Sequence, residues 1–560
     1  MALTNSMASL MLLCMSILIL LHPISASNYH DNYAKVLILG AGASGLEAAK
    51  YLLDKGMRDF IVIEGADYVG GRVHSVPFGG VTVELGANWA HPGGTDIVKQ
   101  VHDIKLDTYH TNWNNRIVRN ITGHDVTDEF DSNWDRLEDA INVTRTIGKD
   151  ILDNHKPDMS QRAALRLGDW VPKTPIDSVV EWFEYDFQWT DPPSVTSLQS
   201  TTLLPADESD EWFVKDPRGY EYIFNDIIES IRKDPYLSPI RLNKIVVSVD
   251  QSSKDIVIVT CDDGTEFTGD YVLVTFGLGV LQAGSVKFLP ALPYWKTKAL
   301  FQFRIGSFTK IFLKWSTKFW DDKEWIVHVN DRRGYYPIFL NLEAQGLFPN
   351  GTKAHLFPSG TNTLVAFVVG DESRRIESQP DWKTKAEVEQ VLRDLYGAKT
   401  VPEADEMLIT GWNRKSLHRG AFSNWPVEVS QDCFKKIQAR VDRLFFAGEH
   451  TDEVFNGYIL GAQLSGKREA GKIYQCVVDE VCLDPLYPGV DPNTASKTNP
   501  RALPLMALII IAGVLLILKA SHTHNFMFKV ILAASRIVIL SAAVYLPKSF
   551  DFSLGSSRKS

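Results

Sequence analysis

Cysteine, long apolar runs and clusters of positive charge are all scarce in this chain. Five cysteines stand among 560 residues, and no CxxC pair or cluster of His and Cys indicates a metal site. Acidic residues outnumber basic ones by 68 to 58, for a formal charge of −10, and no basic tract is interleaved with aromatic residues. These absences argue against a metalloprotein and against a nucleic-acid binder. What is present, 45% apolar and 22% charged residues, is the balance of a globular protein large enough for more than one core.

Residues 1–27 predict a secretory signal peptide. Residues 10–21 are apolar and uncharged, and small residues follow them. The segment before this stretch lacks the usual positive charge, so an uncleaved membrane anchor is the alternative. An extracellular or luminal location is also favoured by three Asn-x-Ser/Thr sequons, which predict N-glycosylation at Asn120, Asn142 and Asn350.

Four cysteines remain after the leader: Cys261, Cys433, Cys476 and Cys482. The last two are close enough in sequence to form a disulfide in an oxidising compartment, although their spatial separation does not follow from spacing.

The C-terminal segment changes character twice. Residues 484–501 are rich in Pro, Asn and Ser and predict a linker. Residues 502–520 are apolar and just long enough to cross a bilayer, which predicts a membrane anchor. In the tail, 521–560, a second apolar stretch over 530–547 is interrupted by Arg536. That stretch is compatible with a second span, an interfacial helix, or a tail removed during lipid anchoring.

A dinucleotide-binding βαβ unit is predicted near the N-terminus. An apolar run over residues 35–39 leads into Gly40, Gly42 and Gly45 and then into a segment compatible with a helix. Such glycines allow a tight turn, a close approach of the backbone to a pyrophosphate, and close packing of helix on strand. Glu64 ends the next apolar run about 20 residues on, where a carboxylate accepts hydrogen bonds from a ribose. An ordinary glycine-rich turn is the alternative.

Further motifs indicate which dinucleotide cofactor is expected. Gly70, Gly71 and Arg72 follow Glu64 closely, residues 81–89 read VTVELGANW, and residues 444–451 read LFFAGEHT, followed by NGYILGA at 456–462. In this order they resemble the flavin-containing amine oxidases, most of all the secreted plant-type polyamine oxidases. The resemblance extends over residues 34–482 and includes further segments at 192–199, 218–221, 332–336 and 422–427.

The resemblance implies an α/β fold in which a Rossmann-like FAD-binding domain is interleaved with an α+β substrate-binding domain that contains a mixed or antiparallel sheet. The FAD-binding domain is expected over residues 34–105, 213–292 and 413–483, and the substrate-binding domain over 106–212 and 293–412. No cysteine stands at residues 456–458, where related monoamine oxidases attach their flavin, so non-covalent FAD is expected.

The family's cofactor contacts carry over to matching positions. Arg72 is expected along the pyrophosphate, with Gly70 and Gly71 admitting the cofactor close to the chain. One of Val246 and Val247 is expected to contact the adenine through its backbone. The remaining contacts are expected from Gly448, from Glu449, which would bond the ribityl chain, and from Trp425, which could equally be a packing residue.

The resemblance implies two catalytic residues, one that contacts the substrate amine and one beside the flavin. Glu84 is the candidate for a carboxylate that contacts the amine, with a structural cap as the alternative. Lys310 matches the family lysine that holds a water near flavin N5, although a lone lysine is usually a solvated surface charge. Tyr458 and Phe422 are expected to sandwich the carbon chain of the amine, with ordinary core packing as the alternative.

Three positions depart from the plant pattern. Gln188 replaces a second acidic residue of the tunnel, Phe308 replaces a tyrosine beside the lysine segment, and His418 replaces another tyrosine that lines the site. The loss of one remote cation anchor puts the substrate in doubt, so a shorter or acetylated polyamine could fit better.

The sequence thus predicts an extracytosolic polyamine oxidase that uses FAD. The expected cycle transfers a hydride from an amine α-carbon to flavin N5, hydrolyses the imine to an aldehyde and a smaller amine, and returns the electrons to O₂ as hydrogen peroxide. The alternatives are another flavin amine oxidase or L-amino-acid oxidase, for which no motif supplies a carboxylate-binding arginine, and a catalytically impaired FAD-binding scaffold. The sequence is silent on the oligomeric state.

Overall fold

The computed structural model describes residues 32–479 and 482, apart from 92–95, 205–210, 236, 238–239, 348–352 and 428. A seven-stranded sheet forms one half of this region, with the order β12-β9-β10-β11-β1-β2 and with β22 also paired to β11. Its strands are β1 (Tyr33–Leu39), β2 (Phe60–Ile63), β9 (Val246–Asp250), β10 (Val257–Cys261), β11 (Glu266–Val274), β12 (Lys287–Leu289) and β22 (Leu444–Phe446). β1 lies between β2 and β11 and runs parallel to both. The apolar run that begins the predicted nucleotide unit therefore forms a central strand covered on both faces.

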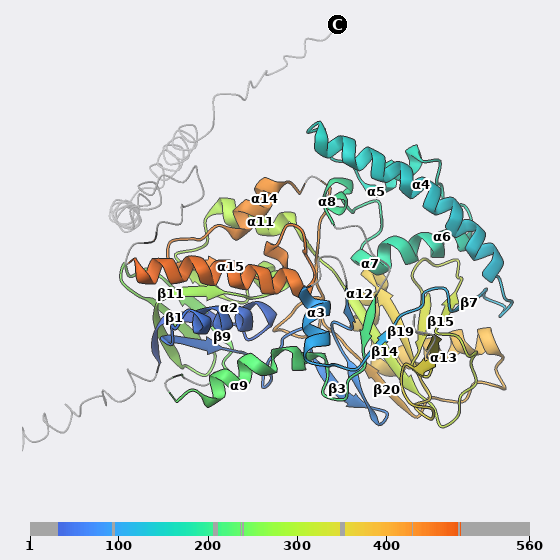
Figure 1. Ribbon diagram of the computed structural model, residues 1–560. Helices are drawn as coiled ribbons and strands as arrows, with labels where there is room; N and C mark the ends of the chain where they lie inside the picture. Colours follow the sequence, from blue (N-terminus) through green and yellow to red (C-terminus); the bar gives the residue numbers. More distant parts are fainter. Residues whose placement is uncertain are drawn as a thin grey trace, which may run out of the picture. The chain divides into compact units, whose positions relative to one another are not determined.

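Helices α2 (Ala43–Asp54) and α15 (Ile459–Val478) pack side by side against this sheet (Figure 1). Their contact is close because Gly466 of α15 faces the backbone of α2: a Cβ at Gly466 would stand 2.1 Å from the carbonyl oxygen of Ser44. Apolar residues of both helices join β1 in one buried cluster. The other helical elements of this half are α3 (Asp96–Asp103), η2 (Tyr220–Phe224), α9 (Asn225–Lys233), α10 (Leu278–Ala283), α11 (Tyr294–Gln302), α14 (Gln431–Gln438) and η3 (Glu449–Thr451).

A second, six-stranded sheet has the order β20-β14-β19-β16-β15-β7. Its strands are β7 (Arg116–Arg119), β14 (Phe308–Lys314), β15 (Trp325–His328), β16 (Ile338–Asn341), β19 (Thr363–Val369) and β20 (Glu406–Ile409). All its pairs are antiparallel except β15 with β7. Alternate residues of β14 enter different clusters: Phe312 packs into an aromatic core, and Ile311 packs on the opposite face with helix α13 (Asp381–Tyr396).

Helices cover the aromatic face of this sheet. The long α4 (Thr127–Asp153) packs against α5, α6 and α8 (Figure 1). The helical elements on this side are α5 (Gln161–Leu167), α6 (Pro175–Glu181), a π-helical turn η1 (Trp182–Asp186), α7 (Phe187–Trp189) and α8 (Leu198–Thr202). α12 (Gly370–Ser378) follows β19, and its Ile376 joins the cluster on the opposite face of the sheet.

Small sheets complete the described chain. A three-stranded sheet, β5-β8-β6, combines β5 (Trp89–Ala90), β8 (Trp212–Val214) and β6 (Thr108–His110). Two-stranded sheets pair β3 (Ser75–Phe78) with β4 (Val81–Glu84), β13 (Arg304–Ile305) with β21 (Ser423–Asn424), and β17 (Gln345–Leu347) with β18 (Lys353–His355).

The predicted α/β class with mixed and antiparallel sheets is confirmed. Strands of the seven-stranded sheet come from residues 33–63, 246–289 and 444–446, and strands of the six-stranded sheet from 116–119, 308–369 and 406–409. The described residues nevertheless belong to one compact unit, so the division into two interleaved domains stays a prediction.

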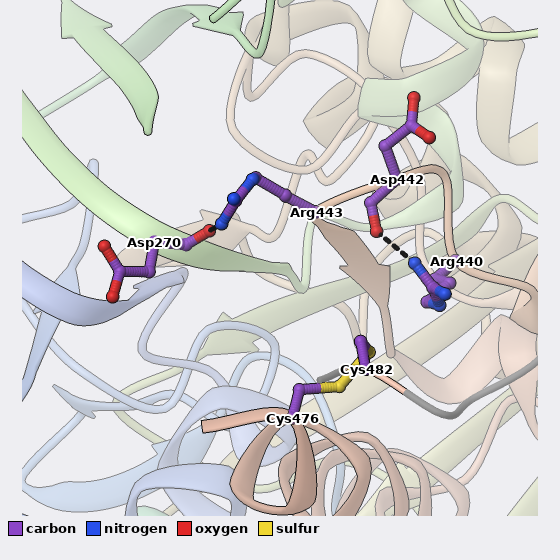
Figure 2. The surroundings of a disulfide bond; sticks show 6 residues. All are labelled: Asp270, Arg440, Asp442, Arg443, Cys476 and Cys482. Atoms are coloured by element: carbon purple, nitrogen blue, oxygen red, sulfur yellow. Dashed lines mark hydrogen bonds between the residues drawn. A yellow bond between two sulfur atoms is a disulfide. The ribbon is translucent and has the colours of Figure 1, made fainter. Parts of the chain in front are cut away.

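Cys476 and Cys482, whose pairing the sequence leaves open, form a disulfide. It joins α15 to the chain just beyond it, as Figure 2 shows. In the same view Arg443 donates to the carbonyl oxygen of Asp270 over 2.9 Å and so ties the start of β22 to β11. Cys261 and Cys433 are buried and free.

Several predictions fall on residues outside the described part. These are the signal peptide at 1–27, the sequon at Asn350, the linker at 484–501, the anchor at 502–520 and the tail at 521–560. Within the described residues, no helix combines the length and the apolar character that crossing a membrane requires.

Candidate active site

A cavity of about 970 Å³ is lined by residues from both large sheets. Of the residues that the sequence proposes for the site, all but Gly45 and Glu84 line it. The lining set contains Gly40, Gly42, Glu64, Gly70, Gly71, Arg72, Gln188, Val246, Val247, Phe308, Lys310, His418, Phe422, Trp425, Gly448, Glu449 and Tyr458. Segments more than 400 residues apart in sequence therefore contribute to one site.

The glycine turn after β1 has the geometry that a phosphate site needs. Gly40 adopts a left-handed φ of +114°, which favours glycine, and starts the turn. A Cβ at Gly42 would meet nothing within 4 Å, so the cavity reaches this backbone. A Cβ at Gly45 would stand 1.9 Å from the carbonyl oxygen of Gly40, so this glycine permits the packing of α2 on the turn rather than contact with a ligand. The N-terminus of α2 thus faces the cavity with exposed N–H groups.

Glu64 ends β2 and braces this turn. Its two carboxylate oxygens accept hydrogen bonds from the backbone N–H of Ala41 at 2.7 Å and of Ala66 at 2.8 Å. Burial raises the pKa of Glu64, and these backbone donors oppose the effect. The carboxylate is therefore held at the cavity wall beside the glycine turn.

Arg72 and Glu449 form an ion pair across the cavity wall, in which Glu449 is buried and Arg72 is partly exposed. The guanidinium donates to Glu449 at 2.9 Å and to the carbonyl oxygen of Ala421 at 2.5 Å. Glu449 also accepts from the hydroxyl of Ser423 and from the backbone N–H of Gly457. Burial alone would raise the pKa of Glu449, but the charge of Arg72 and these donors outweigh it, so the pKa is lowered and the carboxylate stays ionised.

Four buried polar atoms of cavity-lining residues lack a partner among the described residues. They are Oγ of Ser44, Oε1 of Gln161, Nε1 of Trp425 and Nδ2 of Asn456. An unsatisfied buried donor or acceptor costs about 1–3 kcal/mol, so such atoms in a cavity indicate a polar ligand. Together with the open space at Gly42, they fit a large nucleotide cofactor, and Trp425 is available as a donor to it.

Lys310 is buried at the end of β14 nearest the cavity. Its ammonium donates to the carbonyl oxygens of Glu84 at 2.9 Å and Gly86 at 2.6 Å, and to Oδ1 of Asn88. Burial lowers the pKa of Lys310, and the nearby Glu84 opposes the shift. An ammonium has three donors, and all three have protein acceptors here. Holding a water, as the sequence predicts for Lys310, requires one of these contacts to be released.

The prediction that Glu84 contacts the substrate disagrees with the structure. Its carboxylate accepts from the hydroxyl of Ser75 at 2.8 Å and from the backbone N–H of Tyr220 at 2.8 Å, and it does not line the cavity. The reason is strand register, because Glu84 of β4 pairs directly with Ser75 of β3 and its side chain lies beside that residue. Burial raises the pKa of Glu84, and the donors at Tyr220 and Ser75 oppose the shift.

An aromatic wall forms the other side of the cavity. Phe308 lies between Phe187, at 5.7 Å between ring centroids, and Phe422, at 6.1 Å. Gln188, next to Phe187 on α7, is exposed at this wall. His418 lies beside Trp412, and burial with the charge of Arg72 lowers the pKa of His418 to about 3, so this ring is neutral at physiological pH.

The structure adds charged residues that the sequence did not single out. His91 and Glu211 line the cavity and form a hydrogen-bonded pair at 3.2 Å. Arg145 and Lys149 of α4 line it as well. His91 stands two residues after the recognisable segment at 81–89, so a signal for it existed. The other three stand in segments without a motif and are found only through the fold.

Comparisons with known proteins agree with this geometry. The family described as flavin containing amine oxidoreductase matches residues 43–474. Polyamine oxidase 1 of Zea mays is 37% identical over 476 residues, which cover 80% of this chain and 92% of the relative. Polyamine oxidase 6 of Oryza sativa subsp. japonica is 34% identical over 499 residues, which cover 85% of this chain and 97% of the relative.

Solved structures give the same fold. A putrescine oxidase bound to putrescine superposes with a TM-score of 0.61 at 19% identity, over 79% of this chain and 99% of that chain. At this identity the likeness concerns the fold alone. The family match covers most of the described chain, from the start of α2 to α15, and includes Arg72 and Glu449; it confirms the resemblance seen in the sequence and makes FAD the cofactor. The protein therefore belongs to the flavin-containing amine oxidoreductases.

Proposed function

We propose that the protein is a polyamine oxidase. FAD, when bound, supplies the acceptor for a hydride from the carbon beside an amine nitrogen; the imine then hydrolyses to an aldehyde and a smaller amine, and O₂ becomes hydrogen peroxide. The observation that carries the proposal is that one cavity joins the nucleotide turn at Gly42 to a buried lysine, Lys310, and an aromatic wall containing Phe308 and Phe422. The names of the relatives from Zea mays and Oryza sativa support the substrate class.

The aromatic wall favours the deprotonation of the amine that this reaction needs. A free alkylamine has a pKa near ~10.4, like that of lysine, and must lose a proton before its lone pair can assist hydride loss. A poorly hydrated pocket lowers that pKa. Phe308, Phe422 and Tyr458 are placed to exclude water from the carbon chain, and the buried Lys310 opposes the approach of a second positive charge to the reacting end.

A second candidate substrate is an amine that carries a carboxylate. Arg145 and Lys149 on α4 line the cavity, and a planar guanidinium suits a carboxylate. Sequence motifs alone had supplied no such arginine. An amino-acid-like amine with its anionic group toward α4 is the form that these two cations favour.

Anaerobic reduction of the yellow holoenzyme separates these candidates. Spermine, spermidine, putrescine, N-acetylated polyamines and L-amino acids are added in turn, and the loss of oxidised-flavin absorbance is followed. The proposal expects reduction by one or more polyamines and hydrogen peroxide on admission of air. Reduction by amino acids alone would favour the second candidate, and no reduction by any amine would favour an FAD-binding scaffold.

The role of Lys310 is tested by Lys310→Met, with Lys314→Met as the control on the same strand. Lys314 bonds the carbonyl oxygen of Gly79 and does not line the cavity. Lys310→Met is expected to keep FAD and slow flavin reduction or reoxidation at least about tenfold, the effect of losing one positioned group in a catalytic site. Equal rates in the two variants would remove Lys310 from the reaction.

FAD is expected to be held without a covalent bond. Neither free cysteine of the described chain, Cys261 or Cys433, lines the cavity. Acid precipitation should leave the yellow colour in the supernatant. Colour that remains in the pellet would overturn this expectation.

We also propose entry into the secretory pathway and a C-terminal membrane anchor. The disulfide between Cys476 and Cys482 suits an oxidising compartment, and the apolar segments at 10–21 and 502–520 supply a leader and an anchor. Of the predicted sequons, Asn142 is exposed on α4 and Asn120 is partly exposed after β7. Loss of mass on treatment with an N-glycosidase, and resistance of the protein to alkaline extraction from membranes, would be the expected results.

A further inference from the structure

The three-stranded sheet beside the cavity brings a histidine and a glutamate together. β5 and β8 are antiparallel, with Trp89 opposite Phe213 and Ala90 opposite Trp212. The same register, continued by one residue, places His91 opposite Glu211. The imidazole Nδ1 and a carboxylate oxygen of Glu211 are 3.2 Å apart. The pair is thus fixed by backbone pairing between segments 120 residues apart.

This pair belongs to the aromatic part of the cavity. His91 packs its ring edge against Tyr458, with 5.2 Å between ring centroids and an interplanar angle of 89°. The side chain of Glu211 is 8% exposed and that of His91 is 36% exposed. Both line the cavity that contains Lys310. A ligand against Tyr458 therefore lies within reach of the pair.

Glu211 is also distinguished by where the other carboxylates lie. Among the described residues, four carboxylates line the cavity. Glu64 is bonded to the glycine turn, and Glu449 is bonded to Arg72. Glu184 lies on η1 and directly precedes Tyr185, which also lines the cavity. Glu211 is the carboxylate whose hydrogen-bonded partner contacts Tyr458.

We propose that Glu211, held by His91, is the anionic site that recognises the cationic nitrogen of the substrate. The inference rests on the proposed function and deepens it. A mostly buried carboxylate attracts an alkylammonium strongly because few waters compete, and the resulting hydrogen bond is of the charge-assisted kind. Glu84 is turned away from the cavity and position 188 is a neutral glutamine, so this one site carries the charge recognition near the aromatic wall.

The site predicts a particular selectivity. A single anionic anchor beside Tyr458 recognises one ammonium group, and the neutral Gln188 adds no second anchor along the tunnel. Affinity should therefore depend on the presence of one cation more than on the number of cations. A monoamine of sufficient length should bind about as well as a diamine of the same length.

The test uses two probes of one shape, octylamine and octan-1-ol, bound to the full-length holoenzyme. Binding is measured without turnover, in the absence of oxygen, from the perturbation of the flavin spectrum or, where the amine reduces the flavin, from the concentration dependence of the reduction rate. The wild type is expected to bind octylamine about tenfold or more tighter than octanol, as for a charged hydrogen bond. Glu211→Gln should abolish most of that preference while leaving octanol unchanged.

Glu184→Gln is the matched control, since it removes a different cavity carboxylate, on η1, and should keep the preference. If Glu211→Gln retains no FAD, His91→Lys replaces it, because a fixed cation at this partly exposed position neutralises Glu211 and should lower the preference in the same way. A preference for octylamine that survives in these variants would overturn the inference. A holoenzyme that oxidises no polyamine and yet shows a Glu211-dependent preference would instead overturn the proposed function and keep the inference.

Discussion

The two ends of the cavity differ in how they are built. At the cofactor end, the glycine turn, Glu64 and the pair Arg72–Glu449 are joined by backbone contacts and ion pairs that leave little freedom. At the substrate end, the lining comes from separate elements, including β14 with Phe308, α7 with Gln188 and the small sheet with His91 and Glu211. The residues at the cofactor end therefore belong to contiguous sequence motifs, whereas the residues at the substrate end are brought together only by the fold.

The largest expected effect is the loss of stability in Gly45→Ala, which distinguishes Gly45 from Gly42 at the cofactor end. Gly45→Ala places a Cβ 1.9 Å from the carbonyl oxygen of Gly40, which the turn cannot accommodate without moving. We expect a loss of more than about 3 kcal/mol in the free energy of unfolding, above the usual range for overpacking, and little soluble protein. The measurement is the thermal unfolding temperature together with the ratio of flavin to protein absorbance.

Gly42→Ala is the control for this change. Its φ of −77° suits alanine and its Cβ would meet no protein atom within 4 Å. The variant should fold with unchanged or slightly raised stability and lose affinity for FAD, because the methyl group projects into the cavity. Equal losses of stability in the two variants would contradict the assignment of Gly45 to helix packing and of Gly42 to the approach of the cofactor.

These glycines show what could be predicted from the sequence. Gly40, Gly42 and Gly45 interact within six residues, so their spacing already contained the geometry. Glu84 stands in an equally recognisable segment, yet the register of β4 with β3 turns its carboxylate to Ser75. A motif identifies a segment but does not determine which face of a strand meets a cavity.

The residues that sequence reasoning missed have the same explanation. Glu211 meets His91 through the pairing of β5 with β8, and Arg145 reaches the cavity through the packing of α4 on α8. Neither contact has a local signal, since a lone acid or base in a polar segment is usually a solvated surface charge. The predicted cofactor residues other than Gly45 line the cavity and their contacts with FAD stay predictions, whereas Glu211, His91 and Arg145 were not predicted at all.

The next effect concerns the ion pair of the cofactor end. Glu449→Gln leaves Arg72 without its carboxylate, and breaking a buried pair costs about 3 kcal/mol or more. The pKa of Glu449 is lowered in the folded protein, so its contribution is present above the ordinary carboxyl range and is lost as the pH falls through the folded-state value. The unfolding temperatures of wild type and variant should therefore differ most near pH 7 and converge in acid. A constant difference at all pH values would contradict this assignment.

Beside the six-stranded sheet, away from the cavity lining, lies a buried carboxyl group whose pKa is shifted in the opposite direction. Glu324 precedes β15, accepts from Tyr109 and the backbone of Asn112, and burial raises its pKa to about 8. Because the folded-state value exceeds the unfolded-state value, the folded protein binds more protons between them. Stability should thus fall as the pH rises from about 5 to 8, by up to about 1.4 kcal/mol per pH unit.

Glu324→Gln mimics the protonated form and tests this sign. The variant should match the wild type near pH 5 and unfold at a higher temperature than the wild type near pH 8.5. Comparison with Glu449→Gln contrasts the two directions of pKa shift. The difference in unfolding temperature between variant and wild type disappears in acid for Glu449→Gln and grows in base for Glu324→Gln. A Glu324→Gln variant less stable than the wild type at pH 8.5 would show that the carboxylate is ionised and well compensated.

The smallest expected effect tests the substrate end directly. Gln188→Glu restores an acidic group at an exposed position of the cavity wall, where solvent screens it, so an added attraction is worth about 0.2–1 kcal/mol. The Kd for spermine should fall by up to about fivefold, while the Kd for octylamine and the FAD content stay unchanged, because only a long polycation reaches both Gln188 and the Glu211 site. A gain that is equal for octylamine and spermine would mean that position 188 acts on the same nitrogen as Glu211. The substrate end would then contain one charge site instead of two positions along a tunnel.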